Sequence, residues 1–154
     1  MRFRLLCVGK PKEATLAQLH DRYAERLRRL NVGYEADWVP DVRPTSRLDD
    51  ESLREREARL LLDRLDGKGT LVALDSRGDL VRSDELAKRF ERYASPRCTV
   101  IVGGPAGLHR DLLDRSDWIW SLSPLTFPHE LVRGLVAEQL YRAVTILRGT
   151  PYHK

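Results

Sequence analysis

Short apolar runs that alternate with amphipathic helical patterns are the feature that most constrains how this chain can fold. The predicted strands cover residues 3–8, 34–39, 70–74, 99–102 and 118–122. Several of them are continuous apolar runs, which suit strands covered on both faces, as in a mostly parallel sheet. The strands therefore indicate a sheet that lies between two layers of helices.

Helical patterns fill the intervals between these strands. Apolar residues at three- and four-residue spacing predict helices over residues 16–30 and 49–65. A third helix is predicted to start at Ser83 as its N-cap, and a short one covers residues 109–115. The strongest pattern, over residues 128–147, ends with Gly149 as a C-cap. This alternation predicts an α/β fold, with a single domain spanning residues 1–154 and helices on both faces of the sheet.

Composition narrows the classes of partner. The formal net charge is +4, which favours a polyanionic partner without requiring nucleic acid. No apolar run approaches the roughly 20 residues that span a bilayer, so we expect a cytoplasmic protein without a membrane partner. Cys7 and Cys98 are predicted to be small buried hydrophobes, and no cluster has metal-ligand spacing, so no metal is expected. His20 and His109 are predicted to be surface residues.

Two segments follow the ends of predicted strands, where ligands bind in open α/β sheets. Asp75 and Gly78 follow the third strand, either as a plain turn or as part of a site. Gly103, Gly104 and Gly107 follow the fourth strand, and they form either a tight turn or a place where a ligand approaches the backbone. The glycine spacing does not match a dinucleotide or P-loop fingerprint, so a phosphate-binding loop is not supported.

A third segment, residues 120–130, leads from the last strand into the long C-terminal helix. Pro128 suits the first turn of that helix, and His129 then lies at its start with Arg133 one turn later. The helix dipole favours the neutral imidazole at such a position. The alternative is a polar residue that merely ends a loop.

Two further segments have an ordinary and a functional interpretation. Residues 41–47 are either a surface connection or an RNA-contacting arm. The tail places Tyr152, His153 and Lys154 together, which suits stacking on a base and moving protons, although short tails are commonly frayed.

These residues resemble one family along the whole chain. Its motifs match Val72-Ala73-Leu74-Asp75 with Gly78, Ile101-Val102-Gly103-Gly104 with Gly107-Leu108, Ser121-Leu122-Ser123 through Leu125-Thr126-Phe127-Pro128-His129, Leu131-Val132-Arg133, Glu138, Tyr141-Arg142-Ala143 and Tyr152-His153-Lys154. The chain resembles the type H pseudouridine N3-methyltransferases of the ribosomal large subunit, which belong to the SPOUT class. One departure is the Pro105-Ala106 pair, which places alanine where some relatives have an acidic or polar residue.

The resemblance implies a SPOUT-type trefoil knot in the C-terminal segment and a homodimer. It implies S-adenosylmethionine as cofactor, held by backbone groups at Leu74, Gly103, Leu122, Ser123, Pro124, Leu125, Thr126 and Phe127. It also implies methylation of N3 of a pseudouridine in 23S rRNA of the assembled ribosome, with the tail of one subunit completing the site of its partner.

Methyl transfer to N3 requires a group that accepts the N3 proton or stabilises the resulting anion. His129, Tyr152 and His153 are the candidates by residue type, and Arg133 and Arg142 are candidates to stabilise negative charge. The alternative function is a non-enzymatic RNA-binding protein with the same fold.

Overall fold

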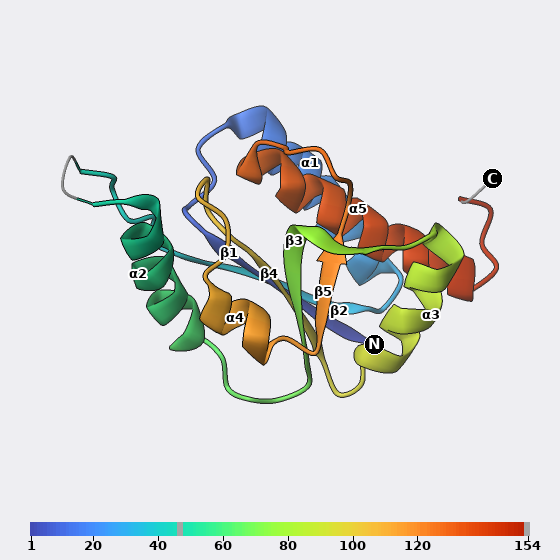
Figure 1. Ribbon diagram of the computed structural model, residues 1–154. Helices are drawn as coiled ribbons and strands as arrows, with labels where there is room; N and C mark the ends of the chain where they lie inside the picture. The colour runs from blue at the N-terminus through green and yellow to red at the C-terminus, as the bar shows by residue number, and fades with distance from the viewer. Residues whose placement is uncertain (46–47, 153–154) are drawn as a thin grey trace.

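The structure, a computed structural model, describes residues 1–45 and 48–152, and the strands in this part of the chain form one parallel sheet (Figure 1). The strands are β1 (Arg2–Val8), β2 (Gly33–Val39), β3 (Thr70–Leu80), β4 (Cys98–Val102) and β5 (Trp118–Ser121). They lie in the order β2-β1-β4-β3-β5. Because all of them run parallel, their carboxyl ends share one edge of the sheet, and the loops that follow β3, β4 and β5 meet there.

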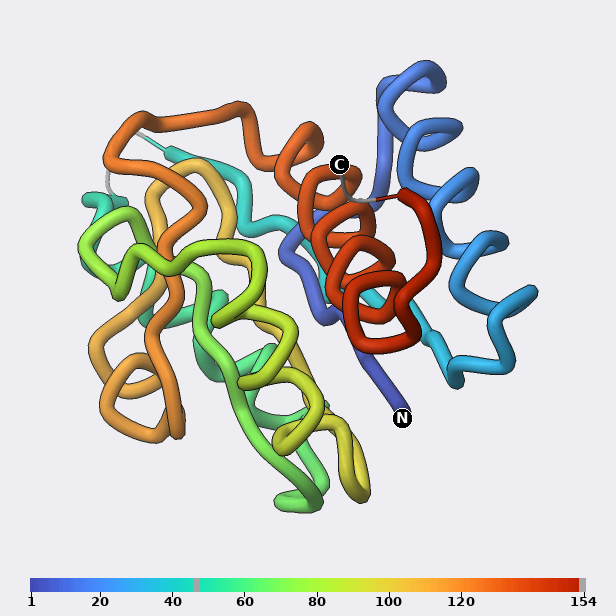
Figure 2. Tube along the Cα trace, turned by 90° about the vertical axis from the view of Figure 1, so that its right-hand side faces the viewer, coloured from blue at the N-terminus to red at the C-terminus, as the bar shows by residue number. Residues whose placement is uncertain are grey.

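Helices cover both faces of the sheet. On one face, α5 (His129–Leu147) packs between α1 (Ala14–Arg29) and α3 (Ser83–Tyr93), as Figure 2 shows. On the other face lie α2 (Asp50–Leu62) and α4 (Arg110–Arg115), which contact each other. The first turn of α5 therefore lies close to the edge of the sheet where β3, β4 and β5 end.

Neighbouring residues within one strand supply two separate cores. Leu5 and Val100 face the α1, α3 and α5 layer, whereas Leu6 and Ile101 face the α2 and α4 layer. All four side chains are essentially inaccessible to solvent. Since successive side chains of a strand point to opposite faces, a strand covered on both sides must be apolar throughout. This requirement explains the continuous apolar runs in the sequence.

The predicted fold class is confirmed, and three details of the helices and strands differ. Strand β3 does not end at Leu74 but continues to Leu80, and it changes register against β5 between Leu74 and Asp79. Ser83 is the first residue of α3 rather than its N-cap, because Arg82 still has extended backbone geometry. The second predicted helix ends at Leu62, three residues early. The trefoil knot stays a prediction.

Two histidines that were predicted to lie on the surface are instead largely covered. The His20 Nε2 atom lies 2.8 Å from the hydroxyl of Tyr34, and Nδ1 lies 3.0 Å from a carboxylate oxygen of Asp21. His109 caps α4, where its Nδ1 accepts the backbone N–H of Asp111. The prediction was wrong because the polar partners of both histidines are too common in the sequence to stand out.

The described cysteines are buried and free. Burial raises the pKa of both thiols, Cys7 and Cys98, to about 12. Of the segment 41–47, residues 46 and 47 lie outside the described residues, and its two interpretations stay open. None of the described helices combines the length and hydropathy that a bilayer span requires.

Candidate functional site

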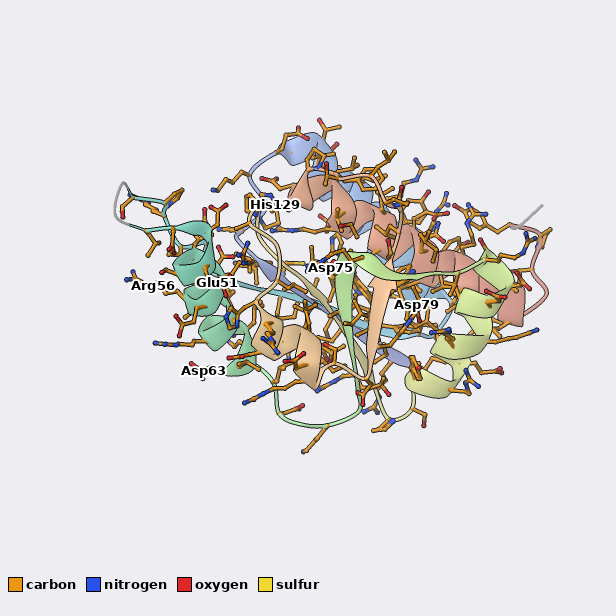
Figure 3. The ribbon with its side chains drawn as sticks, viewed as in Figure 1. Glu51, Arg56, Asp63, Asp75, Asp79 and His129 are labelled. Atoms are coloured by element: carbon orange, nitrogen blue, oxygen red, sulfur yellow. The ribbon has the colours of Figure 1, made fainter. Side chains whose placement is uncertain are left out.

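A cavity of about 340 Å³ lies at the carboxyl edge of the sheet, and residues from all three predicted segments line it. Leu74 and Asp75 come from β3, and the turn after β4 contributes Gly103. The segment after β5 contributes Leu122, Ser123, Leu125, Thr126, Phe127, Pro128 and His129. Figure 3 shows Asp75 and His129 near this edge of the sheet. Of the eight residues predicted to bind a cofactor, Pro124 is not among those that line the cavity.

The glycine turn presents backbone to the cavity because no side chain fits inside it. A Cβ atom at Gly103 would lie 2.9 Å from the backbone carbon of Gly107 and 3.0 Å from its oxygen. Gly104 and Gly107 are bridged, and the N–H of Gly107 donates to the carbonyl of Gly104. Gly107 has a φ of +85°, a conformation that L side chains rarely adopt. The turn is therefore closed, narrow and available to a ligand through its main chain.

A buried carboxyl group supports the glycine turn from α2. Glu57 is 3% exposed, and a Cβ atom at Gly104 would lie 2.9 Å from its Oε2. Burial raises the pKa of Glu57, while hydrogen bonds from the backbone of Val42 and Gly104 oppose that rise. Glu57 was not predicted from the sequence. A signal was present, because Glu57 stands four residues from both Leu53 and Leu61 on the apolar side of the helix.

The loop after β5 is tied to the end of β3 by hydroxyl groups. The Ser121 hydroxyl lies 3.2 Å from the carbonyl of Ser76 and 3.0 Å from that of Ser123. The hydroxyl of Ser123 in turn accepts the backbone N–H of Leu125. Leu125 is 70% exposed and Phe127 is also exposed, so the cavity has an apolar rim. Such a rim suits the flat face of a nucleoside base.

The register change in β3 places a carboxylate beside the cavity. Asp75 lies in the bulge between the two paired parts of β3, and the Arg77 guanidinium donates to both of its carboxylate oxygens, at 2.9 and 3.0 Å. A Cβ atom at Gly78 would lie 2.6 Å from the carbonyl oxygen of Ile119, so the bulge approaches β5 too closely for a side chain there. Hydrogen bonds from Arg77 lower the pKa of Asp75, which keeps it ionised.

His129 is the first residue of α5 and lines the cavity. Pro128 provides the N-cap, a position that does not require a backbone donor. Burial lowers the pKa of His129, and the charge of nearby Arg133 lowers it further. The imidazole is therefore neutral at neutral pH and able to accept a proton.

The structure does not bring Arg133 into this cavity. Its side chain is nearly completely buried, and one terminal nitrogen donates to the carbonyls of Val8 and Gly9, at 2.7 and 2.6 Å. Its Nε atom is buried without a partner. Arg133 thus joins the first turn of α5 to the end of β1, and it acts on His129 through its charge.

The described part of the tail packs away from the cavity in its own chain. The Tyr152 hydroxyl donates to the Glu138 carboxylate at 3.0 Å, and its ring lies edge-on against Tyr141. Glu138 also accepts from Arg142, whose guanidinium lies over the Tyr152 ring. Residue 138 is about 14 Å along the helix axis from His129 at 1.5 Å per residue. His153, the other predicted tail residue, lies outside the described residues.

The cavity thus combines a turn of glycines without side chains, an apolar rim, one carboxylate and a neutral imidazole. This set of groups suits a nucleoside-like ligand better than a polyphosphate. Within the described residues, no group of three or more His, Cys, Asp or Glu side chains is placed to hold a metal ion.

Comparison with known proteins gives matches along the whole chain. A family model described as "Predicted SPOUT methyltransferase" matches residues 1–153. Three curated relatives carry the name "Ribosomal RNA large subunit methyltransferase H". The protein of Alkalilimnicola ehrlichii is 41% identical, with 100% of this chain and 99% of the relative covered. The protein of Rhizobium etli is 39% identical, with 100% of this chain and 99% of the relative covered. The protein of Acetivibrio thermocellus is 37% identical, with both chains covered completely.

Proposed function

The chain belongs to the SPOUT methyltransferase family, and on that premise we propose that it methylates N3 of a pseudouridine in 23S rRNA of the assembled ribosome, with S-adenosylmethionine as methyl donor. The observation that carries the proposal is the cavity itself, which the Gly103 turn and the loop after β5 line at the head of α5. The names of the full-length relatives support ribosomal RNA of the large subunit as the substrate. A ribosomal substrate is consistent with a cytoplasmic protein.

The cavity fits the proposed cofactor in size and in chemistry. Its volume lies at the lower end of the range of about 300–1,000 Å³ that small-molecule sites occupy. The residues that would hold the cofactor are the seven predicted ones that line the cavity, mainly through their backbone groups: Leu74, Gly103, Leu122, Ser123, Leu125, Thr126 and Phe127. Gly103 admits no side chain, so the turn remains open to close approach. When bound, the cofactor supplies a methyl group on a cationic sulfonium, and its transfer requires positioning rather than a metal.

A residue of the chain then has to accept the proton that leaves N3. His129 lines the cavity and is neutral at neutral pH, so it is the proposed proton acceptor. Tyr152 is suited to donate a hydrogen bond rather than to accept the proton, because burial and its hydrogen bonds raise its pKa and keep the phenol protonated. Arg133 positions the first turn of α5 rather than touching the substrate.

A homodimer is part of the proposal because one chain does not bring its own tail to the cavity. Tyr152 is held at Glu138 and Tyr141, well away from His129 along the same helix. A tail contributed by the partner subunit would place Tyr152 and His153 beside the cavity. Arg142, which is paired with Glu138 and covers the Tyr152 ring, would support that segment.

The decisive experiment is methyl transfer from labelled S-adenosylmethionine to whole ribosomes, followed by mapping of the modified base. We expect one methylated pseudouridine in 23S rRNA. Modification at another base would contradict the substrate assignment. Calorimetry that shows no cofactor binding would instead favour a non-enzymatic RNA-binding protein.

Mixing two inactive variants tests the shared site. His129→Ala removes the proposed proton acceptor, and deletion of residues 152–154 removes the tail. In a mixed dimer, one of the two sites contains both an intact His129 and an intact tail, so activity should return to a substantial fraction of the wild-type value. No recovery, in a mixture shown to contain mixed dimers, would refute a tail supplied by the partner.

A further inference from the structure

The ionisable side chains that line the cavity are few. In the part of the chain that the structure describes, the lining side chains are apolar or small and polar except for His129 and Asp75. Asp75 is the one carboxylate among them, and its side chain is only 11% exposed. Because it is so little exposed to solvent, this carboxylate interacts with a bound charge more strongly than a surface carboxylate does.

The geometry of the bulge keeps Asp75 ionised and in place. Its carboxylate accepts from the backbone N–H of Arg77 as well as from the Arg77 guanidinium. Asp75 is anchored to its own bulge rather than to the glycine turn or to α5. The Arg77 side chain is 77% exposed, so water screens its positive charge, whereas Asp75 is only 11% exposed and lines the cavity.

The head of α5, which also lines the cavity, has the opposite polarity. His129 begins a 19-residue helix, and the backbone amides at that end carry a partial positive charge. The cavity is thus negative at the β3 bulge and positive at the head of α5. A ligand with a cationic centre is favoured with that centre toward Asp75.

We infer that Asp75 makes this site selective for the cationic sulfonium cofactor over its neutral thioether product. The inference rests on the proposed function. In the transfer, the bond from sulfur to the methyl carbon breaks and sulfur keeps its electron pair. The N3 lone pair forms the new bond to carbon, and the N3 proton passes to a base. The cofactor loses its positive charge in this step, so the attraction to Asp75 disappears and release of the product is favoured.

Binding measurements on Asp75→Asn test this selectivity without reference to turnover. Asparagine keeps the size of the side chain and removes its charge. Isothermal titration gives Kd for S-adenosylmethionine, for S-adenosylhomocysteine, and for sinefungin, which carries a cationic amine in place of the sulfonium. We expect Kd to rise about tenfold for the two cationic ligands, which is the effect of losing one partly buried charge–charge interaction. Kd for S-adenosylhomocysteine should stay within about twofold of the wild-type value. Retained binding of the neutral ligand also shows that the variant is folded.

Two variants serve as controls. Asp79→Asn removes a carboxylate from the same strand that is 61% exposed and bonded to Arg89 and Trp118, so all three ligands should bind as to the wild type. Arg77→Ala removes the cation that competes for Asp75, so the preference for cationic ligands should be kept or increased.

Three outcomes would overturn the inference. Equal weakening of all three ligands by Asp75→Asn would mean that the carboxylate serves a group common to them, such as the ribose hydroxyls. Unchanged binding of all three would mean that its charge does not reach the ligand. If Arg77→Ala lost the preference for cationic ligands while Asp75→Asn kept it, the preference would depend on the ion pair and not on the charge of Asp75. Failure of the proposed function looks different, because the wild-type protein would then bind none of these ligands.

Discussion

Replacing Arg133 with methionine should destabilise the protein and raise the pKa of His129 at the same time. The substitution keeps an unbranched side chain of similar length in a nearly fully buried site. It removes the two hydrogen bonds to the carbonyls of Val8 and Gly9, which are then left without this donor. It also removes the positive charge that helps to lower the pKa of His129.

The magnitude follows from the two lost bonds. Hydrogen bonds from a charged donor contribute about 1.5–3 kcal/mol each. Part of that loss is recovered, because the unfavourable burial of a guanidinium with an unpartnered Nε is also removed. We therefore expect the free energy of unfolding to fall by about 3 kcal/mol, which lowers Tm by about 6–12 °C for a chain of this length. Arg133→Lys should lose less, because an ammonium group can still donate to both carbonyls.

Urea denaturation measures the stability, and NMR titration of the imidazole C–H signals measures the pKa of His129. Arg29→Met is the matched control, since Arg29 is 74% exposed and pairs with Glu25 across one helical turn; it should cost at most about 0.5 kcal/mol. A loss below about 1 kcal/mol in Arg133→Met, or an unchanged pKa of His129, would refute the role given to Arg133.

Three further predictions concern the site and the core. The pKa of His129 lies below its usual value near 6.5, so the rate of methyl transfer should stay constant down to about pH 6.5 and fall only below it; a fall that begins above pH 7 would argue against His129 as the proton acceptor. Gly103→Val should weaken cofactor binding at least about a hundredfold, since even its Cβ lies 2.9 Å from the Gly107 backbone. Gly67→Ala, which meets no atom within 4 Å but has a φ of +67°, should cost some stability and leave titration of the cofactor unchanged. Cys7 and Cys98 are buried thiols whose pKa is about 12, so Ellman's reagent at pH 8 should modify neither within minutes in the native protein and both after denaturation; fast reaction of the native protein would contradict their burial.

Patterns of neighbouring residues carried most of the correct predictions about the fold. The parallel sheet follows from runs such as 99–102, because a strand between two helical layers has no solvent-facing positions. The start of α5 could be predicted from Pro128 and His129, because these two residues are adjacent in the sequence and therefore also in space. The sequence also placed the candidate residues of the 74–78, 103–107 and 122–129 segments after the ends of strands, whereas Arg133, Arg142, Tyr152 and His153 belong to the C-terminal helix and the tail. The motifs then gave the family, which the comparisons confirm.

Contacts between distant segments were decided only by the tertiary structure. Arg133 stands in the family motif beside His129, yet its partners are carbonyls about 125 residues away, which no local pattern encodes. Glu57 supports the glycine turn from another helix, and the β3 bulge depends on Gly78 meeting Ile119. A side chain's local sequence sets its conformational preferences and its usual chemistry. Its burial, its electrostatic surroundings and its partners depend on what the rest of the chain brings to it, and these are the quantities that separate a residue facing the cavity from one that holds the helix in place.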